Sequence, residues 1–265
     1  MEITYKSFSD GFSWILSALK LCLPKAPAFI LKSFLASLVF ALIFFIIGAI
    51  GSLLSNIRLL TGVIAVAIVM FVLFLCFYCG FIRAIQTMID NGNVAFGSFF
   101  FALNKKFLFK IAPFAIITGL ATSAVSGIIG FLSYLAISKV GSQVLFYVLL
   151  LIFVLVMVPM GIYATYALIL FVQRNDPKIF ATFSYTAKGL SNNILPVMGM
   201  YLGLVAVGIV LSVIGIILVS TFQSNHEAFM AIILGVIALV LYCGYFMLSL
   251  TSICISSKEI FVKRR

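Results

Sequence analysis

Charged side chains are scarce in this chain of 265 residues, at 9% of the total, and only six of them are acidic. Soluble domains carry about a quarter charged residues, so this composition excludes a soluble globular fold, a disordered segment and a coiled coil. Hydrophobic residues make up 65% of the chain. We therefore expect a protein whose surroundings are mostly lipid.

Residues that perform catalysis or bind metals are equally few. The one histidine, His226, stands beside Glu227 in a predicted outer loop and is most simply an exposed turn residue, since it cannot form a multi-histidine metal site. Cys76 and Cys79 form a C-x-x-C motif inside a predicted span, where a packing role is favoured over a redox or metal-binding one. Phosphate-binding and dinucleotide-binding loops are missing. The composition therefore predicts a protein that is not an enzyme and has neither a metal nor a cofactor.

Six uncharged apolar runs are each long enough for a membrane-crossing helix, which needs about 20 residues. Pro113 and Pro196 lie near the starts of two runs, where a missing N–H costs little, whereas Pro159, followed by Gly161, lies deep in the fourth run and predicts a kink or hinge. The sequence thus predicts six transmembrane helices. The runs span residues 33–57, 59–82, 111–138, 140–173, 189–225 and 228–257.

The basic residues predict the topology. Of the 17 lysines and arginines, all but Arg58 and Lys139 fall in the N-terminal segment, the second and fourth connections or the C-terminal tail. Lys and Arg concentrate on the cytoplasmic side of membrane proteins, so we expect both termini in the cytoplasm. This asymmetry also accounts for the net charge of +11 without a nucleic-acid partner. The first apolar run begins only after Lys32 and is expected to be a retained span rather than a signal peptide.

An internal repeat is visible once three prolines are aligned. Pro27, Pro113 and Pro196 each follow an aromatic residue by 13 positions. Gly161 and Gly244 each follow their proline by 48 positions, and Gly80 follows Pro27 by 53. We interpret the chain as one membrane domain of three tandem units, about 7–90, 93–175 and 176–261, each a cytoplasmic helix followed by a two-span hairpin. The three prolines with Gly80 and Gly244 are then candidate packing positions, and three hairpins around one axis would leave a central cytoplasmic cleft.

The helix predicted before each hairpin carries an apolar stripe at helical spacing. Ser7 with Asp10 resembles a capping box for the first of these helices, and Asp176 before Pro177 resembles the N-terminal cap of the third. Helices of this kind lie in the membrane interface and direct their lysines at lipid headgroups. The stripes are Phe8, Phe12, Ile15, Leu16, Leu19 and Leu23; Phe96, Phe99, Phe100, Leu103 and Phe107; and Ile179, Phe183, Ala187, Leu190 and Ile194. The candidate headgroup contacts are Lys20, Lys105, Lys106, Lys110 and Lys188.

Small residues spaced four apart predict close helix packing. Gly199 and Gly203 form a G-x-x-x-G motif, and Ser123 with Gly127 and Ser126 with Gly130 form similar pairs. We expect these positions to pack the bundle internally rather than to build a homodimer.

Two stretches resemble bacterial inner-membrane families with six spans and no assigned function, among them the YciC-like family and a related proteobacterial family named by locus tag. The first runs from Gly80 to Pro113 and contains Asp-Asn-Gly at 90–92, and the second runs from Pro159 to Pro196. The C-terminal Lys-Glu-Ile-Phe at 258–261 is similar to the closing motif of that family. The resemblance implies a polytopic all-α fold in the inner membrane and implies no activity.

The first functional hypothesis is a non-enzymatic inner-membrane protein that handles a lipid or a hydrophobic small molecule, or serves as the membrane subunit of an assembly. Its expected partners are anionic lipid headgroups on the cytoplasmic side and a possible protein partner. The second hypothesis is a small-solute transporter, which the Pro159 kink favours and the lack of membrane-embedded charge opposes. The third is an interaction, assembly or toxin-immunity protein.

Overall fold

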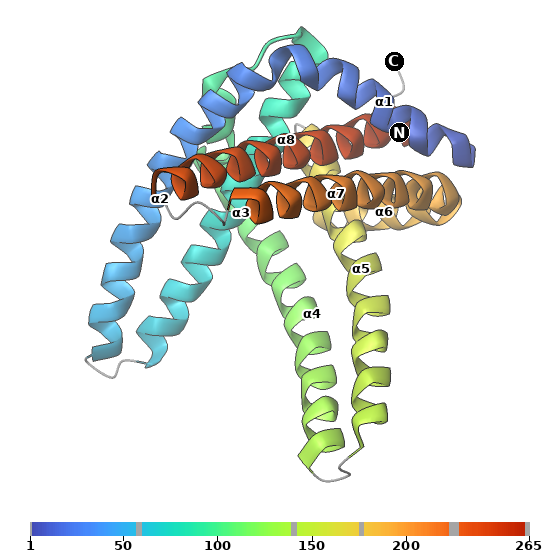
Figure 1. The fold of residues 1–265 in the computed structure, drawn as a ribbon. Coiled ribbons are helices and arrows are strands. Elements are labelled where there is room, and N and C mark those ends of the chain that lie inside the picture. The colour runs from blue at the N-terminus through green and yellow to red at the C-terminus, as the bar shows by residue number, and fades with distance from the viewer. Residues whose placement is uncertain (1, 57–59, 139–141, 175–177, 223–227, 263–265) are drawn as a thin grey trace. The chain divides into compact units, whose positions relative to one another are not determined.

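The computed structural model describes residues 2–56, 60–138, 142–174, 178–222 and 228–262, and nearly all of them are helical (Figure 1). The predicted all-α fold class is therefore confirmed. In chain order the elements are β1 (Glu2–Ile3), α1 (Phe8–Cys22), the 3-10 helix η1 (Leu23–Lys25), α2 (Ala26–Asn56), α3 (Leu60–Asn91), the 3-10 helix η2 (Phe96–Leu103), α4 (Lys105–Ser138), α5 (Gln143–Gln173), α6 (Ile179–Asn192), α7 (Ile194–Phe222), α8 (Ala228–Ile260) and β2 (Phe261–Val262).

Six helices, α2, α3, α4, α5, α7 and α8, have 29 to 34 residues. Among the described residues, six helical stretches are long and apolar enough to cross a membrane, which confirms the predicted number. The fifth predicted span, residues 189–225, began too early, because Gly189 belongs to α6 and α7 begins only at Ile194. Hydropathy could not separate the two helices, because Asn193, the one residue between them, is uncharged.

Packing divides the chain into two compact units. Unit 1 comprises Met1–Ala41, Gly80–Phe100 and Ala187–Arg265, and unit 2 comprises Leu42–Cys79 and Phe101–Thr186. The helices α2, α3 and α6 and the 3-10 helix η2 each contribute residues to both units.

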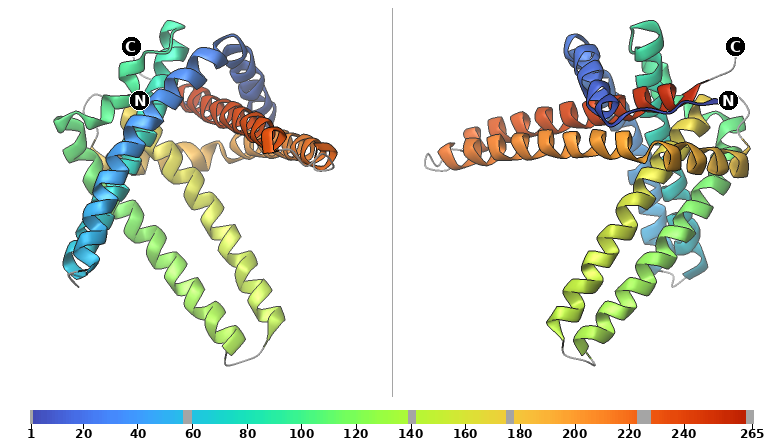
Figure 2. Two further views of the ribbon diagram at one scale, coloured as in Figure 1. Left: turned by 60° about the vertical axis from the view of Figure 1, so that its left-hand side comes forward. Right: turned by 90° about the vertical axis from the view of Figure 1, so that its right-hand side faces the viewer.

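In unit 1, α1 packs against α7 and α8, and α7 and α8 run side by side (Figure 2). The two strands join the N-terminal segment to the C-terminal one, since β1 and β2 pair antiparallel with Ile3 opposite Phe261. The Thr4 amide extends this pairing by donating to the Ile260 carbonyl oxygen at 3.0 Å. Segments more than 250 residues apart in the sequence are thus hydrogen-bonded to each other.

The core of unit 1 combines an aromatic cluster with a polar helix end. Phe29, Phe81 and Phe99 form mutual ring contacts with centroids 5.1 to 6.1 Å apart. The last turns of α8 are buried although they are rich in serine and threonine. The Ser252 and Ser256 hydroxyls donate to carbonyl oxygens of α8 itself, each at 2.8 Å, so burial leaves neither of these two hydroxyls unpaired.

The first predicted stripe does not form the packed face of α1. Of its six residues only Ile15 is buried, and Leu16 and Leu23 are 59% and 65% exposed. The packed face of α1 is therefore made mostly of other residues, which the apolar stripe did not indicate. Lipid solvates large apolar side chains as well as a protein interior does, so close helix packing in membranes selects small residues instead. The buried residues of α1 are Gly11, Trp14, Ile15, Ala18 and Cys22.

The second predicted interfacial helix also differs from the structure. A 3-10 helix covers Phe96–Leu103, and Phe107 belongs to α4. Asn104 separates the two helices, because its side-chain oxygen accepts the Lys106 amide at 3.1 Å and its carbonyl oxygen accepts the Phe107 amide at 2.9 Å. A side chain that offers the backbone such local hydrogen bonds starts a new helix instead of continuing the old one.

In unit 2, α4 packs along α5 through aromatic rings. Phe114 of α4 contacts Phe171 of α5 with ring centroids 5.3 Å apart, and it stacks on Phe183 of α6 at 5.1 Å. Tyr163 of α5 stacks on the other side of Phe183 and donates its hydroxyl to the Phe183 carbonyl oxygen at 2.9 Å. These contacts fix the N-terminal half of α6 against the α4–α5 pair.

The helix starts agree only in part with the sequence analysis. The capping box is confirmed, because the Ser7 amide donates to the Asp10 carboxylate at 2.7 Å. Pro113 does not stand at a helix start, since α4 begins eight residues earlier and the proline lies inside it. The predicted cap at Asp176 and Pro177 lies outside the described residues, as do Arg58, Lys139, His226 and Glu227.

Candidate functional site

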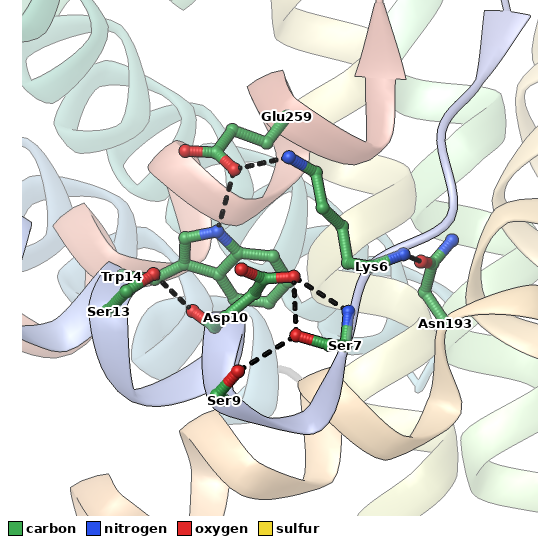
Figure 3. A network of polar contacts seen from close by, with 8 residues as sticks. All are labelled: Lys6, Ser7, Ser9, Asp10, Ser13, Trp14, Asn193 and Glu259. Atoms are coloured by element: carbon green, nitrogen blue, oxygen red, sulfur yellow. Dashed lines mark hydrogen bonds and ion pairs between the residues drawn. The ribbon is translucent and has the colours of Figure 1, made fainter.

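A polar network links the two ends of the chain in unit 1 (Figure 3). The Lys6 ammonium lies 2.8 Å from Oε2 of Glu259, near the end of α8. The same oxygen accepts the indole N–H of Trp14 in α1 at 3.1 Å. One carboxylate oxygen therefore joins the N-terminal segment, α1 and α8.

Asn193 completes this network from the junction of α6 and α7. It is fully buried, its Oδ1 accepts the Lys6 amide at 2.9 Å, and its Nδ2 donates to the Gly189 carbonyl oxygen at 3.0 Å. These bonds satisfy both the oxygen and the nitrogen of its side-chain amide without a ligand.

The neighbouring residue, Lys258, pairs with Asp90 at the end of α3. Successive residues of an α-helix point about 100° apart, so Lys258 and Glu259 reach different partners. The end of α8 is thus held by two ion pairs, to which it contributes the anion in one and the cation in the other. Lys258 and Glu259 both belong to the Lys-Glu-Ile-Phe stretch that resembles a closing motif.

Gln86 is a buried polar side chain of unit 1 that has no hydrogen-bond partner among the described residues. It lies one helical turn before Asp90 on α3 and is 2% exposed, and both its amide nitrogen and its amide oxygen are unsatisfied. Its position near the end of α3 therefore does not satisfy the side chain through a helix cap.

Glu259 offers a direct test of the network, because the buried indole N–H of Trp14 needs an acceptor. A Glu259→Ala exchange removes that acceptor and should lower the free energy of unfolding by about 1–3 kcal/mol, the cost of an unsatisfied buried donor. Glu259→Gln keeps an acceptor and loses only a partly exposed ion pair, worth about 1 kcal/mol or less.

Thermal unfolding in detergent, followed by circular dichroism, measures both Glu259 variants. The expected order of unfolding temperature is wild type, then Glu259→Gln, then Glu259→Ala. Equal values for the two variants would show that Trp14 does not depend on the carboxylate.

The candidate lipid-contact lysines occur in both units. Lys20 of α1 and Lys188 of α6, in unit 1, are exposed, as are Lys105 and Lys106 at the start of α4 in unit 2, whereas Lys110 is half-buried. Large apolar side chains near them are also exposed. Leu23, which follows Lys20, is 65% exposed, and Phe109, between Lys106 and Lys110, is 70% exposed. Ile194, which follows Lys188, is 58% exposed.

The glycine predictions separate into two groups. Gly199 and Gly203 face α1, with Phe8 and Phe12 beside them, so the expected packing inside one chain is confirmed. Gly80 lies directly against the Phe99 carbonyl oxygen of η2. At the remaining predicted positions, Gly127, Gly130, Gly161 and Gly244, no described heavy atom lies within 4 Å of the place that a Cβ would take.

Two close approaches were not singled out from the sequence. Gly11 of α1 lies against the Pro196 carbonyl oxygen and the Met200 amide of α7, and Gly189 of α6 lies against the Phe261 ring. Glycine is common in membrane helices, so composition alone does not indicate which glycine meets another backbone. The useful signal for Gly11 is its spacing from Ala18, which is seven residues, or two helical turns.

The cysteines occupy packing positions. Cys76 and Cys79 are buried in α3 as free thiols, and the Cys22 thiol donates to Thr251 at 3.3 Å in unit 1. Over the described residues, no group of three or more His, Cys, Asp or Glu residues could hold a metal ion.

Unit 2 contains an open cavity of about 220 Å³ between α3, α4 and α5. Most of its lining is apolar. Phe74, Leu75 and Tyr78 contribute from α3, Phe114 and Thr118 from α4, and Ala164, Thr165 and Leu168 from α5.

The six apolar helices define the chain, by length and composition, as a multi-pass membrane protein. Comparison with protein-family models, with curated proteins and with solved structures finds no match. A function must therefore be inferred from the chemistry of these surfaces.

Proposed function

We propose that this chain is a non-enzymatic protein of the bacterial inner membrane that binds anionic lipid at its cytoplasmic side. In this proposal, three tandem hairpins are each preceded by a short helix, both termini are cytoplasmic, and the lysines beside those helices contact lipid headgroups. The element order supports the repeat, since a short helix comes before each pair of long ones.

One observation carries the proposal. In three places, exposed lysines stand within a few residues of large apolar side chains that are also exposed: at the end of α1, at the start of α4 and around the α6–α7 junction. An ammonium group on a flexible stem above an exposed apolar surface is typical of residues at the boundary between headgroups and acyl chains.

The two-sided character of α1 supports the same conclusion. One side packs against α7 and α8 through Gly11, Trp14 and Ala18, and the other exposes Leu16, Leu19 and Leu23. An aqueous environment would penalise such a face, whereas the acyl region of a bilayer would not. Lys20 stands next to Leu19 at the C-terminal end of this helix.

The test compares wild type with a variant in which Lys20, Lys105, Lys106 and Lys188 are replaced by glutamine. Each basic residue near an anionic membrane contributes on the order of 1 kcal/mol. Retention of phosphatidylglycerol, measured by native mass spectrometry, is therefore expected to fall at least about tenfold. Retention of phosphatidylcholine should not change.

The matched control replaces the same four lysines with arginine, which keeps the charge and should keep the lipid. The proposal fails if wild type retains the two lipids equally, or if the glutamine variant retains as much phosphatidylglycerol as wild type does.

A further inference from the structure

We infer that the cavity between α3, α4 and α5 is a binding site for one acyl chain of an anionic phospholipid, whose headgroup lies beside the lysines at the start of α4. This inference rests on the proposed lipid-binding function and adds a particular site within unit 2.

The two threonines that line the cavity do not need a hydrogen-bond partner from an occupant. The Thr118 hydroxyl donates to the Phe114 carbonyl oxygen at 2.8 Å, and the Thr165 hydroxyl donates to the Gly161 carbonyl oxygen at 2.8 Å. Both hydroxyls are thus satisfied within their own helices, and Phe74 and Leu168 add hydrocarbon to the lining. A hydrocarbon occupant fits this lining, which is mostly apolar.

The volume is suited to part of a chain. An apolar cavity of about 150 Å³ is large enough to bind benzene, and this cavity is larger, at about 220 Å³, and open. An open apolar cavity can accept several methylene groups of a chain whose remainder continues into the surrounding lipid.

The charge lies at one end of the cavity. Lys106, Lys110, Phe114 and Thr118 follow one another at intervals of four residues on α4, so they share one face of the helix. Phe114 and Thr118 line the cavity. Lys110 precedes Phe114 by about 6 Å along the axis and Lys106 precedes it by about 12 Å. A phosphate near these ammonium groups would leave its acyl chain within reach of the cavity.

The end of α5 adds positive charge at the same level. Phe171 of α5 contacts both Phe107 and Phe114 of α4, with ring centroids 5.5 and 5.3 Å apart. Arg174, three residues after Phe171, therefore lies toward the lysine end of α4, where its guanidinium is held 4.8 Å from the ring centroid of Tyr185. The cations of both helices thus favour an anionic headgroup over a zwitterionic one.

The experiment fills the cavity and measures lipid retention by native mass spectrometry. Ala164→Phe places a phenyl group in the cavity and should lower retention of phosphatidylglycerol at least fivefold. Ala121→Phe is the matched control, because the same exchange occurs on an exposed position of α4, and it should not lower retention. Lys106→Gln combined with Lys110→Gln should reduce phosphatidylglycerol retention and leave phosphatidylcholine retention unchanged.

A second experiment measures fluorescence quenching and does not require the Ala164→Phe variant. Phe74→Trp places a fluorophore in the lining, and phosphatidylglycerol with brominated acyl chains should quench it at least twofold more than brominated phosphatidylcholine does. Phe131→Trp, at an exposed position of α4, should be quenched equally by both lipids.

The outcomes separate the site from the general function. Wild-type retention in Ala164→Phe, or equal quenching at Phe74→Trp by the two lipids, would overturn the site. The variant with four lysines replaced by glutamine is tested alongside. If that variant retains less phosphatidylglycerol than wild type, anionic-lipid binding stands and only the location of the site is wrong. If wild type shows no preference for phosphatidylglycerol, the proposed function itself fails.

Discussion

Replacing Gly80 with alanine is expected to destabilise unit 1. The added Cβ would overlap the Phe99 carbonyl oxygen of η2. A backbone atom cannot rotate away as a side chain can, so α3 and η2 would have to separate. Overpacking of this kind costs about 1–3 kcal/mol, and sometimes more.

The loss should extend to the aromatic cluster beside it. Phe99 is fully buried and its ring lies 5.1 Å from that of Phe81 and 5.9 Å from that of Phe29. Moving the Phe99 backbone moves this ring as well. Thermal unfolding in detergent should therefore show a clear drop in unfolding temperature, with weaker protection of η2 from hydrogen exchange.

Gly244 provides the matched control, because the sequence analysis assigned it the equivalent position in the third repeat. No described heavy atom lies within 4 Å of the position that its Cβ would take. Alanine is the better helix former by about 1 kcal/mol, so Gly244→Ala should leave the unfolding temperature unchanged or slightly raised. Equal losses in Gly80→Ala and Gly244→Ala would contradict the close approach of α3 and η2.

Replacing Gly11 with alanine should weaken the contact between α1 and α7. A Cβ at this position would overlap the Pro196 carbonyl oxygen and lie 2.7 Å from the Met200 amide nitrogen. Both atoms belong to the backbone of α7, so the helices would have to move apart, at an expected cost of about 1–3 kcal/mol.

Hydrogen exchange distinguishes this local effect from general destabilisation. In Gly11→Ala, the amides of α1 should exchange faster than in wild type, while those of α4 and α5 keep their protection. Gly127→Ala, at an open position of α4, is the control and should leave α1 unchanged. Unaltered protection of α1 in Gly11→Ala would show that the glycine is not needed for docking.

The sequence by itself determined the number and type of the long elements. A membrane-crossing backbone must satisfy its hydrogen bonds internally, so long uncharged runs become helices, and six apolar helices are present. Local signals were also sufficient at two places. Ser7 and Asp10 form a capping box because both partners lie within one turn, and Gly199 and Gly203 face a neighbouring helix of the same chain.

Tertiary structure decided which faces are packed. Hydropathy ranks Leu16 above Gly11, yet Leu16 is exposed and Gly11 is buried. In water the larger apolar residue would be buried, but lipid removes that driving force and leaves van der Waals fit as the criterion. Gly80 and Gly244 stand in similar local sequences, yet an added Cβ would overlap backbone only at Gly80.

The polar network at the chain ends also required the tertiary structure. Glu259 meets Trp14 and Lys6 across separations of 245 and 253 residues, and no periodicity links such distant positions. The cavity of unit 2 likewise depends on three helices that meet. Sequence determines helices through interactions within a few residues, whereas the site depends on side chains that only the packing of distant helices brings together.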